Sequence, residues 1–422
     1  FIPEGVAFPA TAEEISKLLK LANVEGFPII ARGAGSGFTG GSVPVRGGLV
    51  LSTERMNRII DIDKENQVAT VEPGVVCGDL QAEVEAEGLF YPPDPTSLNF
   101  STIGGNIAEC AGGPRAVKYG VTRDYLLGLQ VVLPTGEIIE TGVKTAKGVV
   151  GYDLTRLICG SEGTLGVVTR AHLRLVAKPE VTLTMLAAFA ALPDASRAVS
   201  SIMSSGVVPS TLELIDKVCI GAVNEHSDIT LPDVEALLFV EVDGAANQCE
   251  IDAGRIESIL KEHGATDVKH AKGKKEIRAL WQARRSISQS LRKVKPNKLN
   301  EDVVVPRSRI VELIEGVGDI AEARGLVIAS FGHAGDGNIH VNVMIDNSDE
   351  REAAEGLRAV EDIFSLAISL EGTISGEHGV GTAKAPYLDM ELNKDAIDIM
   401  KRIKDTFDPK GILNPGKIFT AG

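Results

Sequence analysis

Three glycine-rich segments, each close to a run of β-branched residues, constrain most strongly what this chain can fold into. They read RGAGSGFTGG at 32–41, STIGGNIAECAGG at 101–113 and GSEGTLGVV at 160–168. Because glycine lacks a Cβ, backbone N–H groups in such segments can gather around an anion or a long ligand. We therefore expect an extended cofactor held against the main chain, with glycines that serve only in hairpin turns as the alternative.

The first segment does not fit the dinucleotide pattern G-x-G-x-x-G. Phe38 stands where the third glycine is needed, and Pro44 with a strand-like run follows where a helix should begin. A Rossmann domain is therefore not expected.

The remaining patterns predict an α+β protein. Residues 11–25 show helical spacing behind Thr11, and short β-branched runs up to residue 176 predict strands that pair through hairpins, one of them turning at Pro134 and Gly136. From residue 178 onward helical and strand-like runs alternate, which predicts a second α+β domain. The tail is expected to form a helix that Pro409 and Gly411 stop.

Length, charge and cysteine content exclude several classes of protein. The 422 residues suffice for about two or three domains. The 43 basic and 58 acidic residues give a net charge of -15, so nucleic acid is not an expected partner. Five cysteines without a C-x-x-C motif predict buried thiols and a cytoplasmic location, with peripheral contact to a membrane left open. No apolar run approaches the roughly 18 residues of a membrane span, and the start at Phe1 suggests that a segment precedes it.

Two histidine-containing segments are candidates for a metal site. His333 and His340 flank a turn-rich stretch in SFGHAGDGNIHVN, so their imidazoles converge if the two strands fold back. Glu377, in SGEHGVG, adds a carboxylate, and this donor set suits Zn²⁺, Mn²⁺ or Fe²⁺. From the residues alone, ordinary hydrogen-bonded polar groups are the alternative, and Asp336 is better explained as a turn residue than as a ligand.

The helical run KKEIRALWQARRSISQSLRK is a candidate for binding a carboxylate. Trp281, Arg284 and Ser288 share one face, and a guanidinium offers a fork that matches a carboxylate. Solvated cations on an exposed helix are the alternative.

In their order along the chain, several motifs resemble one flavoprotein family. RGAGSG, PPDPTS, STIGGNIAECAGGPRAVKYGVTRDY, GYDLTRL and GSEGTLGVVT are similar to the FAD-binding domain of the PCMH-type, vanillyl-alcohol-oxidase superfamily. Within this superfamily, the motifs resemble most specifically the branch that contains the D-lactate dehydrogenases, the glycolate oxidase FAD subunit and D-2-hydroxyglutarate dehydrogenase. It implies a PCMH-type FAD-binding domain at 1–177 and an α+β cap domain of the FAD-linked oxidase C-terminal type, with the metal site, at 178–385. A C-terminal segment at 386–422 would pack back on the FAD domain.

The resemblance also implies which residues bind the cofactor. FAD would be non-covalent, because Ser36 stands where some relatives carry the histidine that tethers the flavin. The implied cofactor-binding residues are Arg32, Gly33, Ala34, Gly35, Ser36, Gly37, Gly40, Pro93, Thr102, Gly104, Gly105, Asn106, Gly112, Tyr119, Gly160, Glu162, Gly163, Gly166, Val167 and Val168.

The same resemblance assigns the remaining site. His333, His340 and Glu377 would bind the divalent metal, and His378 would be the catalytic base. Substrate binding falls to Arg284, Ser288, Lys298 and Asn342, with Lys384 as a candidate for the mouth of the site.

The expected activity is FAD-dependent oxidation of a D-2-hydroxy acid, D-lactate foremost, to the 2-oxo acid by hydride transfer to the flavin N5. Glycolate and D-2-hydroxyglutarate are alternative substrates of the same mechanism. The chain has no cysteine pattern for an iron-sulfur cluster, so an electron-transferring flavoprotein, an iron-sulfur subunit or a quinone would accept the electrons. A non-haem iron oxygenase and a flavin subunit for electron relay alone are the competing functions.

Overall fold

The computed structural model describes residues 1–420, and the chain divides into two compact units. The first unit comprises Phe1–Gly113, Gly120–Lys178 and Glu377–Gly422, and the second comprises Pro114–Tyr119 and Pro179–Gly376. No helix in the described part of the chain is long and apolar enough to cross a membrane.

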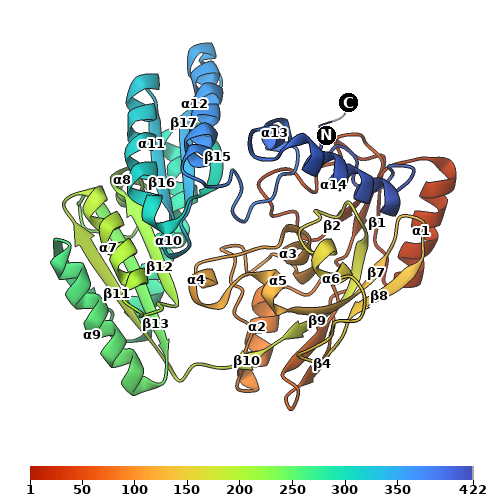
Figure 1. Cartoon of the computed structure of the whole chain (residues 1–422), viewed down its shortest axis with the longest axis horizontal. Helices are drawn as coiled ribbons and strands as arrows, with labels where there is room; N and C mark the ends of the chain where they lie inside the picture. The colour runs from red at the N-terminus through yellow and green to blue at the C-terminus, as the bar shows by residue number, and fades with distance from the viewer. Residues whose placement is uncertain (421–422) are drawn as a thin grey trace. The chain divides into compact units, whose positions relative to one another are not determined.

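The first unit contains two main sheets (Figure 1). The smaller one has the order β1-β3-β2 and is formed by β1 (Gly5–Ala7), β2 (Ile29–Arg32) and β3 (Leu49–Ser52). The larger one has the order β4-β5-β9-β7-β8, with β4 (Ile59–Asp63), β5 (Val68–Val71), β7 (Leu126–Val132), β8 (Ile138–Gly142) and β9 (Val167–Arg174). A two-stranded pair joins β6 (Leu89–Phe90) to β10 (Val176–Ala177).

Strand pairing in this unit agrees only in part with the prediction of hairpins. Strands β4 and β5, and β7 and β8, pair antiparallel as expected, and Gly136 has the positive φ of +90° that the turn between β7 and β8 needs. In the smaller sheet, however, both pairs are parallel, so the prediction was wrong there. Parallel neighbours need a crossover connection, and the chain between the neighbours β1 and β3 passes through α1 (Ala12–Glu25) and β2.

The first predicted helix is confirmed together with its end signals. The Thr11 hydroxyl accepts a hydrogen bond from the Glu14 N–H at 3.2 Å, and Gly26 ends the helix with φ of +78°. Ile15 and Leu19 are fully buried on one face, where they pack in a core with Leu413 from the far end of the chain. The predicted tail helix is α14 (Lys394–Phe407).

Short helices complete the first unit. They are α2 (Cys77–Ala86), α3 (Ile103–Glu109), α5 (Thr122–Tyr125), α6 (Leu154–Ile158), η3 (Ala385–Tyr387) and α13 (Leu388–Glu391). Helix α3 contains two glycines and was not predicted from the sequence.

The second unit is built on one seven-stranded antiparallel sheet with helices between its strands, and it is α+β as the alternating patterns predicted. Its strand order is β14-β11-β13-β12-β16-β17-β15. The strands are β11 (Val181–Phe189), β12 (Thr211–Asp216), β13 (Ala236–Gly244), β14 (Ala265–His270), β15 (Asn297–Val304), β16 (Val327–His333) and β17 (Asn338–Ile345).

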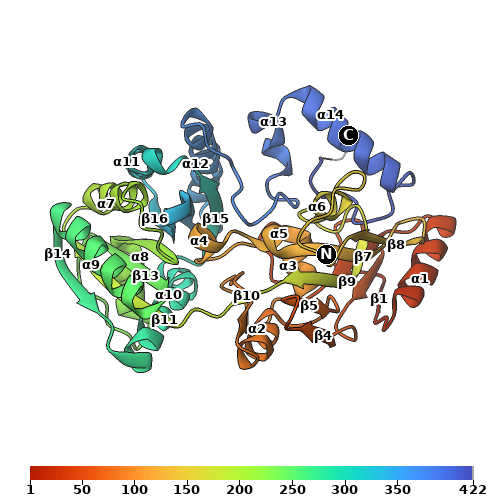
Figure 2. The ribbon, with the colours of Figure 1, turned by 60° about the horizontal axis from the view of Figure 1, so that its bottom comes forward.

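Helices cover both faces of this sheet. Figures 1 and 2 show α7 (Leu192–Ser204) and α9 (Ala246–Glu262) together on one face, and α11 (Ile310–Arg324) packs beside α12 (Glu350–Ser369). Helices α8 (Lys217–His226) and α10 (Gly273–Val294) pack on each other, and a core that includes Phe239, Ile287 and Phe331 joins them to the sheet. The unit also contains α4 (Ala116–Tyr119), η1 (Arg307–Arg309) and η2 (Ala334–Asp336).

Candidate active site

The three glycine-rich segments meet in the first unit. The first lies against the second at Gly33, where an added Cβ would come within 2.1 Å of the Thr102 hydroxyl. Two backbone hydrogen bonds join the second and third segments, from the Gly160 N–H to the Ile107 carbonyl at 2.9 Å and from the Glu162 N–H to the Ala108 carbonyl at 2.8 Å. Segments distant in sequence therefore lie in direct contact.

A side chain from the C-terminal tail ties the first and third segments together. The Asn414 Nδ2 donates to the carbonyl of Gly41 at 2.9 Å and to that of Glu162 at 2.7 Å. Asn414 was not among the predicted site residues, and nothing in its local sequence separates it from other asparagines.

The fit of these loops to FAD can be tested on Asn106. Its Nδ2 is buried and has no hydrogen-bond partner among residues 1–420. A buried amide donor without a partner costs about 1–3 kcal/mol, so a ligand acceptor at this point would stabilise the loop. The residues present therefore fit a cofactor that places a hydrogen-bond acceptor at Asn106.

Most residues implied for the cofactor lie on these three segments or beside them. The end of β2 and the loop after it contain Arg32, Gly33, Ala34, Gly35, Ser36, Gly37 and Gly40. The start of α3 contains Thr102, Gly104, Gly105 and Asn106, and Gly112 follows this helix. The connection from α6 to β9 contains Gly160, Glu162, Gly163 and Gly166, and β9 begins with Val167 and Val168. Pro93 is buried, and its carbonyl accepts from the Gln81 Nε2 at 2.8 Å. Tyr119 lies in the second unit, where its hydroxyl donates to the Asp243 Oδ2 at 2.8 Å.

Glu377 and His378 belong to the first unit, as the start of its C-terminal segment. An added Cβ on Gly112 would lie 2.7 Å from the Glu377 Oε2, so the glutamate lies directly over a glycine. The His378 carbonyl accepts from the Thr39 hydroxyl at 2.9 Å, and its ring lies 4.8 Å from that of Phe38, centroid to centroid. The first glycine segment therefore positions the predicted catalytic base.

Two carboxyl groups lie against the chain just after His378, and one of them, Glu162, binds it. Glu162 accepts from the backbone N–H groups of Val380 and Gly381, both at 2.7 Å. Glu109, which the sequence analysis missed, lies so close that a Cβ on Gly379 would come within 2.5 Å of its Oε2. Burial, reinforced by the charge of Glu162, raises the pKa of Glu109 to about 8. Lys384 is also buried, with 1% of its surface exposed, and therefore does not line an open mouth.

In the second unit, Glu213 on β12 organises the predicted substrate arginine. Arg284 is 4% exposed on α10 and donates from Nε to the Glu213 Oε2 at 2.6 Å, while its Cζ lies 4.7 Å from the centre of the Phe331 ring. The opposite carboxylate oxygen of Glu213 pairs with the His333 Nδ1. The alternative of an exposed, solvated cation at Arg284 is therefore wrong. Glu213 was not predicted, although a charged residue within the apolar run TLELID was a signal.

The protonation of Glu213 follows from these contacts. Burial would raise its pKa, but the charges of Arg284 and His333 outweigh burial and lower the pKa to about 2. The carboxylate is therefore ionised throughout the neutral range and compensates the buried guanidinium.

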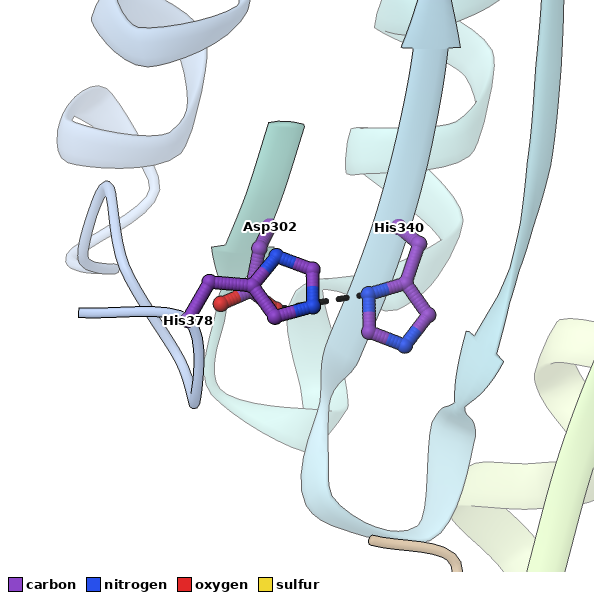
Figure 3. A group of neighbouring side chains, drawn as sticks. All are labelled: Asp302, His340 and His378. Carbon is purple, nitrogen blue, oxygen red and sulfur yellow. Dashed lines mark ion pairs between the residues drawn. The ribbon is translucent and has the colours of Figure 1, made fainter. Parts of the chain in front are cut away.

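His340 has a similar carboxylate partner on the neighbouring strand. Asp302 on β15 is directly opposite His340 on β17, and the Asp302 Oδ1 lies 3.4 Å from the His340 Nδ1 (Figure 3). The ring centroids of His333 and His340 are 5.1 Å apart across the β16-β17 hairpin, as the turn-rich spacing predicted. Asp336 lies in the short helix η2 that makes this turn, in agreement with its interpretation as a turn residue.

This pairing tests the fit of a metal to the donor set. His333 engages a buried carboxylate through Nδ1, so Nε2 is the nitrogen whose lone pair can bind a metal in its neutral ring, and the Asp302 carboxylate lies within ion-pair range of the His340 Nδ1. Metal-binding histidines commonly have this carboxylate–imidazole arrangement. The chemistry of the hairpin therefore fits a divalent cation.

The other predicted substrate residues form a cluster between α10 and strands β15 and β17 of the same sheet. The Lys298 Nζ donates to the Ser288 hydroxyl at 2.8 Å and to the Asn342 Oδ1 at 3.1 Å. Burial, followed by the charge of Arg292, lowers the pKa of Lys298 to about 8. The structure thus brings Ser288, Lys298 and Asn342 into direct contact, although they come from three different elements.

Comparison with known proteins identifies the family. The C-terminal domain of FAD-linked oxidases matches residues 178–418, and an FAD binding domain matches residues 3–142. The chain therefore belongs to the FAD-linked oxidases, which confirms the resemblance and the FAD cofactor.

Among its relatives, the chain is 48% identical to the glycolate oxidase subunit GlcD of Bacillus subtilis (strain 168), over 99% of this chain and 89% of the relative. It is 37% identical to a D-lactate dehydrogenase of Archaeoglobus fulgidus, over 98% of this chain and 90% of the relative.

Solved structures agree with the fold. The chain is similar to p-cresol methylhydroxylase, with a TM-score of 0.80 and 18% identity over 98% of this chain and 88% of that one. It is also similar to 4-ethylphenol oxidase from Gulosibacter chungangensis, with a TM-score of 0.78 and 19% identity over 99% of this chain and 90% of that one. The predicted PCMH-type architecture is confirmed.

Proposed function

We propose that this protein oxidises a small D-2-hydroxy acid to the 2-oxo acid with non-covalent FAD, with D-lactate as the foremost substrate and glycolate or D-2-hydroxyglutarate as alternatives. The observation that carries the proposal is the buried ion pair between Arg284 and Glu213, beside His333. A buried guanidinium held in one orientation suits a planar carboxylate on the substrate. The relatives named for glycolate and D-lactate support this class of substrate.

Binding of the acid would rest on two cations of the second unit. Arg284 would orient the carboxylate, and Lys298, fixed by Ser288 and Asn342, would add a second positive charge. Because Arg284 is almost fully buried, water competes weakly for its N–H groups, and the electrostatic attraction to an anion is correspondingly stronger. An uncharged alcohol would gain neither contact.

A divalent Zn²⁺, Mn²⁺ or Fe²⁺ on His333, His340 and Glu377 would complete the binding site. Glu377 follows Gly376 directly in the chain, and the Gly376 N–H donates to the Asp302 Oδ2 at 2.9 Å, beside His340. This anchoring of the preceding residue supports Glu377 as the third ligand. A bound divalent cation lowers the pKa of a coordinated hydroxyl. Glu213 and Asp302 would orient the two imidazoles and, when a metal displaces the second proton, favour the neutral form with its proton on Nδ1.

His378 would act as the general base that takes the proton of the substrate hydroxyl. Thr39 and Phe38 fix the residue on the first glycine segment, where Arg32 to Gly41 would hold the FAD pyrophosphate. The bound flavin supplies the two-electron redox chemistry. An electron-transferring flavoprotein, an iron-sulfur subunit or a quinone would then accept the electrons.

Anaerobic bleaching of the flavin absorbance tests the proposal. D-lactate, glycolate and both enantiomers of 2-hydroxyglutarate are compared with L-lactate, and we expect rapid bleaching by at least one acid of D configuration or by glycolate. His378→Asn should slow bleaching by about 100-fold or more, as for loss of a general base. His263→Asn, at the end of α9, is the matched control and should bleach normally. Undiminished bleaching in His378→Asn would refute the assignment of the base and favour a flavin subunit that only relays electrons.

A further inference from the structure

Two of the five cysteines lie where the second glycine segment approaches the start of the third, Cys110 within the second segment and Cys159 just before the third. Cys110 caps the C-terminus of α3, and Cys159 caps that of α6 immediately before Gly160. The Cys110 and Cys159 side chains lie close enough to influence each other's ionisation. A Cβ on Gly160 would lie 3.5 Å from the Cys110 Cβ, so the two chains approach closely at this point.

The two thiols differ in the way that reversible oxidation requires. Cys110 is partly exposed and can meet a reagent, whereas Cys159 is 9% exposed. The interaction with the Cys159 thiol, together with a backbone N–H and the charge of Arg123, outweighs burial and lowers the pKa of Cys110 to about 7, whereas the interaction with Cys110 and burial raise the pKa of Cys159. Cys110 therefore carries substantial thiolate at neutral pH, and thiolates are the nucleophiles of disulfide exchange.

We propose that Cys110 and Cys159 form a reversible disulfide that locks the second and third cofactor loops to each other. The two loops are otherwise joined by main-chain hydrogen bonds at Ile107 and Ala108. A covalent bond beside these contacts would restrain the loops from separating, and bound FAD would leave more slowly. The site is independent of which acid the enzyme oxidises.

The oxidant is a small-molecule disulfide. The Cys110 thiolate attacks one of its sulfurs, breaks the reagent S–S bond and releases one reagent thiolate. The Cys159 sulfur then attacks the sulfur of Cys110 in the mixed disulfide, loses its proton to solvent and releases the second reagent thiolate. Two electrons pass from the protein to the reagent, and two reagent thiols are formed.

The test treats the holoenzyme with oxidised glutathione. Thiol titration after denaturation should fall from the five free cysteines to three, and peptide mapping should find Cys110 joined to Cys159. Release of FAD, followed by flavin fluorescence on dilution, should slow several-fold and recover with dithiothreitol. Cys159→Ser should instead retain one glutathione on Cys110 and release FAD at the untreated rate.

Cys249→Ser, on α9 of the second unit, is the matched control and should still form the disulfide. The proposal is overturned if peptide mapping finds no Cys110–Cys159 bond after treatment. It is equally overturned if the bond forms and FAD release is unchanged. Either result can be read without knowledge of the substrate, so it is separate from a failure of the proposed activity.

Discussion

Replacement of Glu213 by glutamine should destabilise the second unit strongly, although the side chain keeps its size. Glu213 is fully buried, and it is the carboxylate that compensates Arg284 and also pairs with His333. The amide carries no charge, so the variant leaves the guanidinium buried without a counter-ion. Breaking a buried ion pair by removing one partner costs about 3–5 kcal/mol.

The pKa of Glu213 gives a similar magnitude. A decrease from 4.5 to about 2 corresponds to ~3 kcal/mol of stabilisation of the ionised form in the folded state. For a unit of this size, such a loss should lower the unfolding temperature by about 6–12 °C. Trp281, the single tryptophan of the chain, lies on α10 close to Arg284, so its fluorescence reports unfolding of this unit.

The pH dependence has a definite sign. Because folding lowers the pKa of Glu213, the stabilisation is fully present above pH 4.5 and is lost as the pH falls towards about 2. The difference between the wild type and Glu213→Gln should therefore be constant near neutral pH and shrink in acid. Glu235→Gln is the control, because its ion pair with Lys217 is exposed and should not shift the transition. A Glu213→Gln variant that unfolds at the wild-type temperature at pH 7 would refute the reasoning.

Three further predictions concern individual side chains. Relative to the wild type, Glu109→Gln should stabilise the first unit increasingly as the pH rises from 4.5 through about 8. Folding raises the pKa of Glu109, so ionisation of this carboxyl group opposes folding in that range. Equal unfolding temperatures of the two proteins at pH 9 would contradict this. Lys298→Met should raise KM for the acid and abolish the increase in KM that we expect in the wild type above about pH 8, where the amine loses its charge. Lys295→Met, at a partly exposed lysine paired with Glu352, should retain the wild-type profile. A wild-type KM that does not change between pH 7 and 9 would argue against a charged Lys298 at the substrate. Asp302→Asn should weaken Mn²⁺ binding by about 10–100-fold in equilibrium dialysis, since the aspartate orients His340. The control Asp336→Asn, in the turn, should bind Mn²⁺ nearly as well as the wild type. Equal affinities of the two variants would exclude that role of Asp302.

The cofactor-binding domain could be identified from the sequence because each of its motifs is a short contiguous segment. A glycine such as Gly33 is required wherever two segments approach without room for a Cβ, and that requirement marks the sequence directly. The convergence of His333 and His340 was readable for a related reason, because a short turn between two strands determines which residues oppose each other. Helix α3 was missed because its glycines disfavour a helix in isolation, and packing of the fully buried Ile103 and Ile107 overrides that preference.

The sequence by itself determined the family, the α+β class and the chemical types of the candidate site residues. Only the tertiary structure decided which carboxylate serves which partner. Glu213 reaches His333 because β12 lies beside β16, and Asp302 reaches His340 because β15 lies beside β17. The strand order brings together Glu213 and His333, about 120 positions apart, and Asp302 and His340, about 40 positions apart. The surroundings of both pairs have low polarity, which strengthens the electrostatic attraction within each pair. No local pattern encodes such a pairing, because the free energy that selects it arises only when the sheet is assembled and water is excluded.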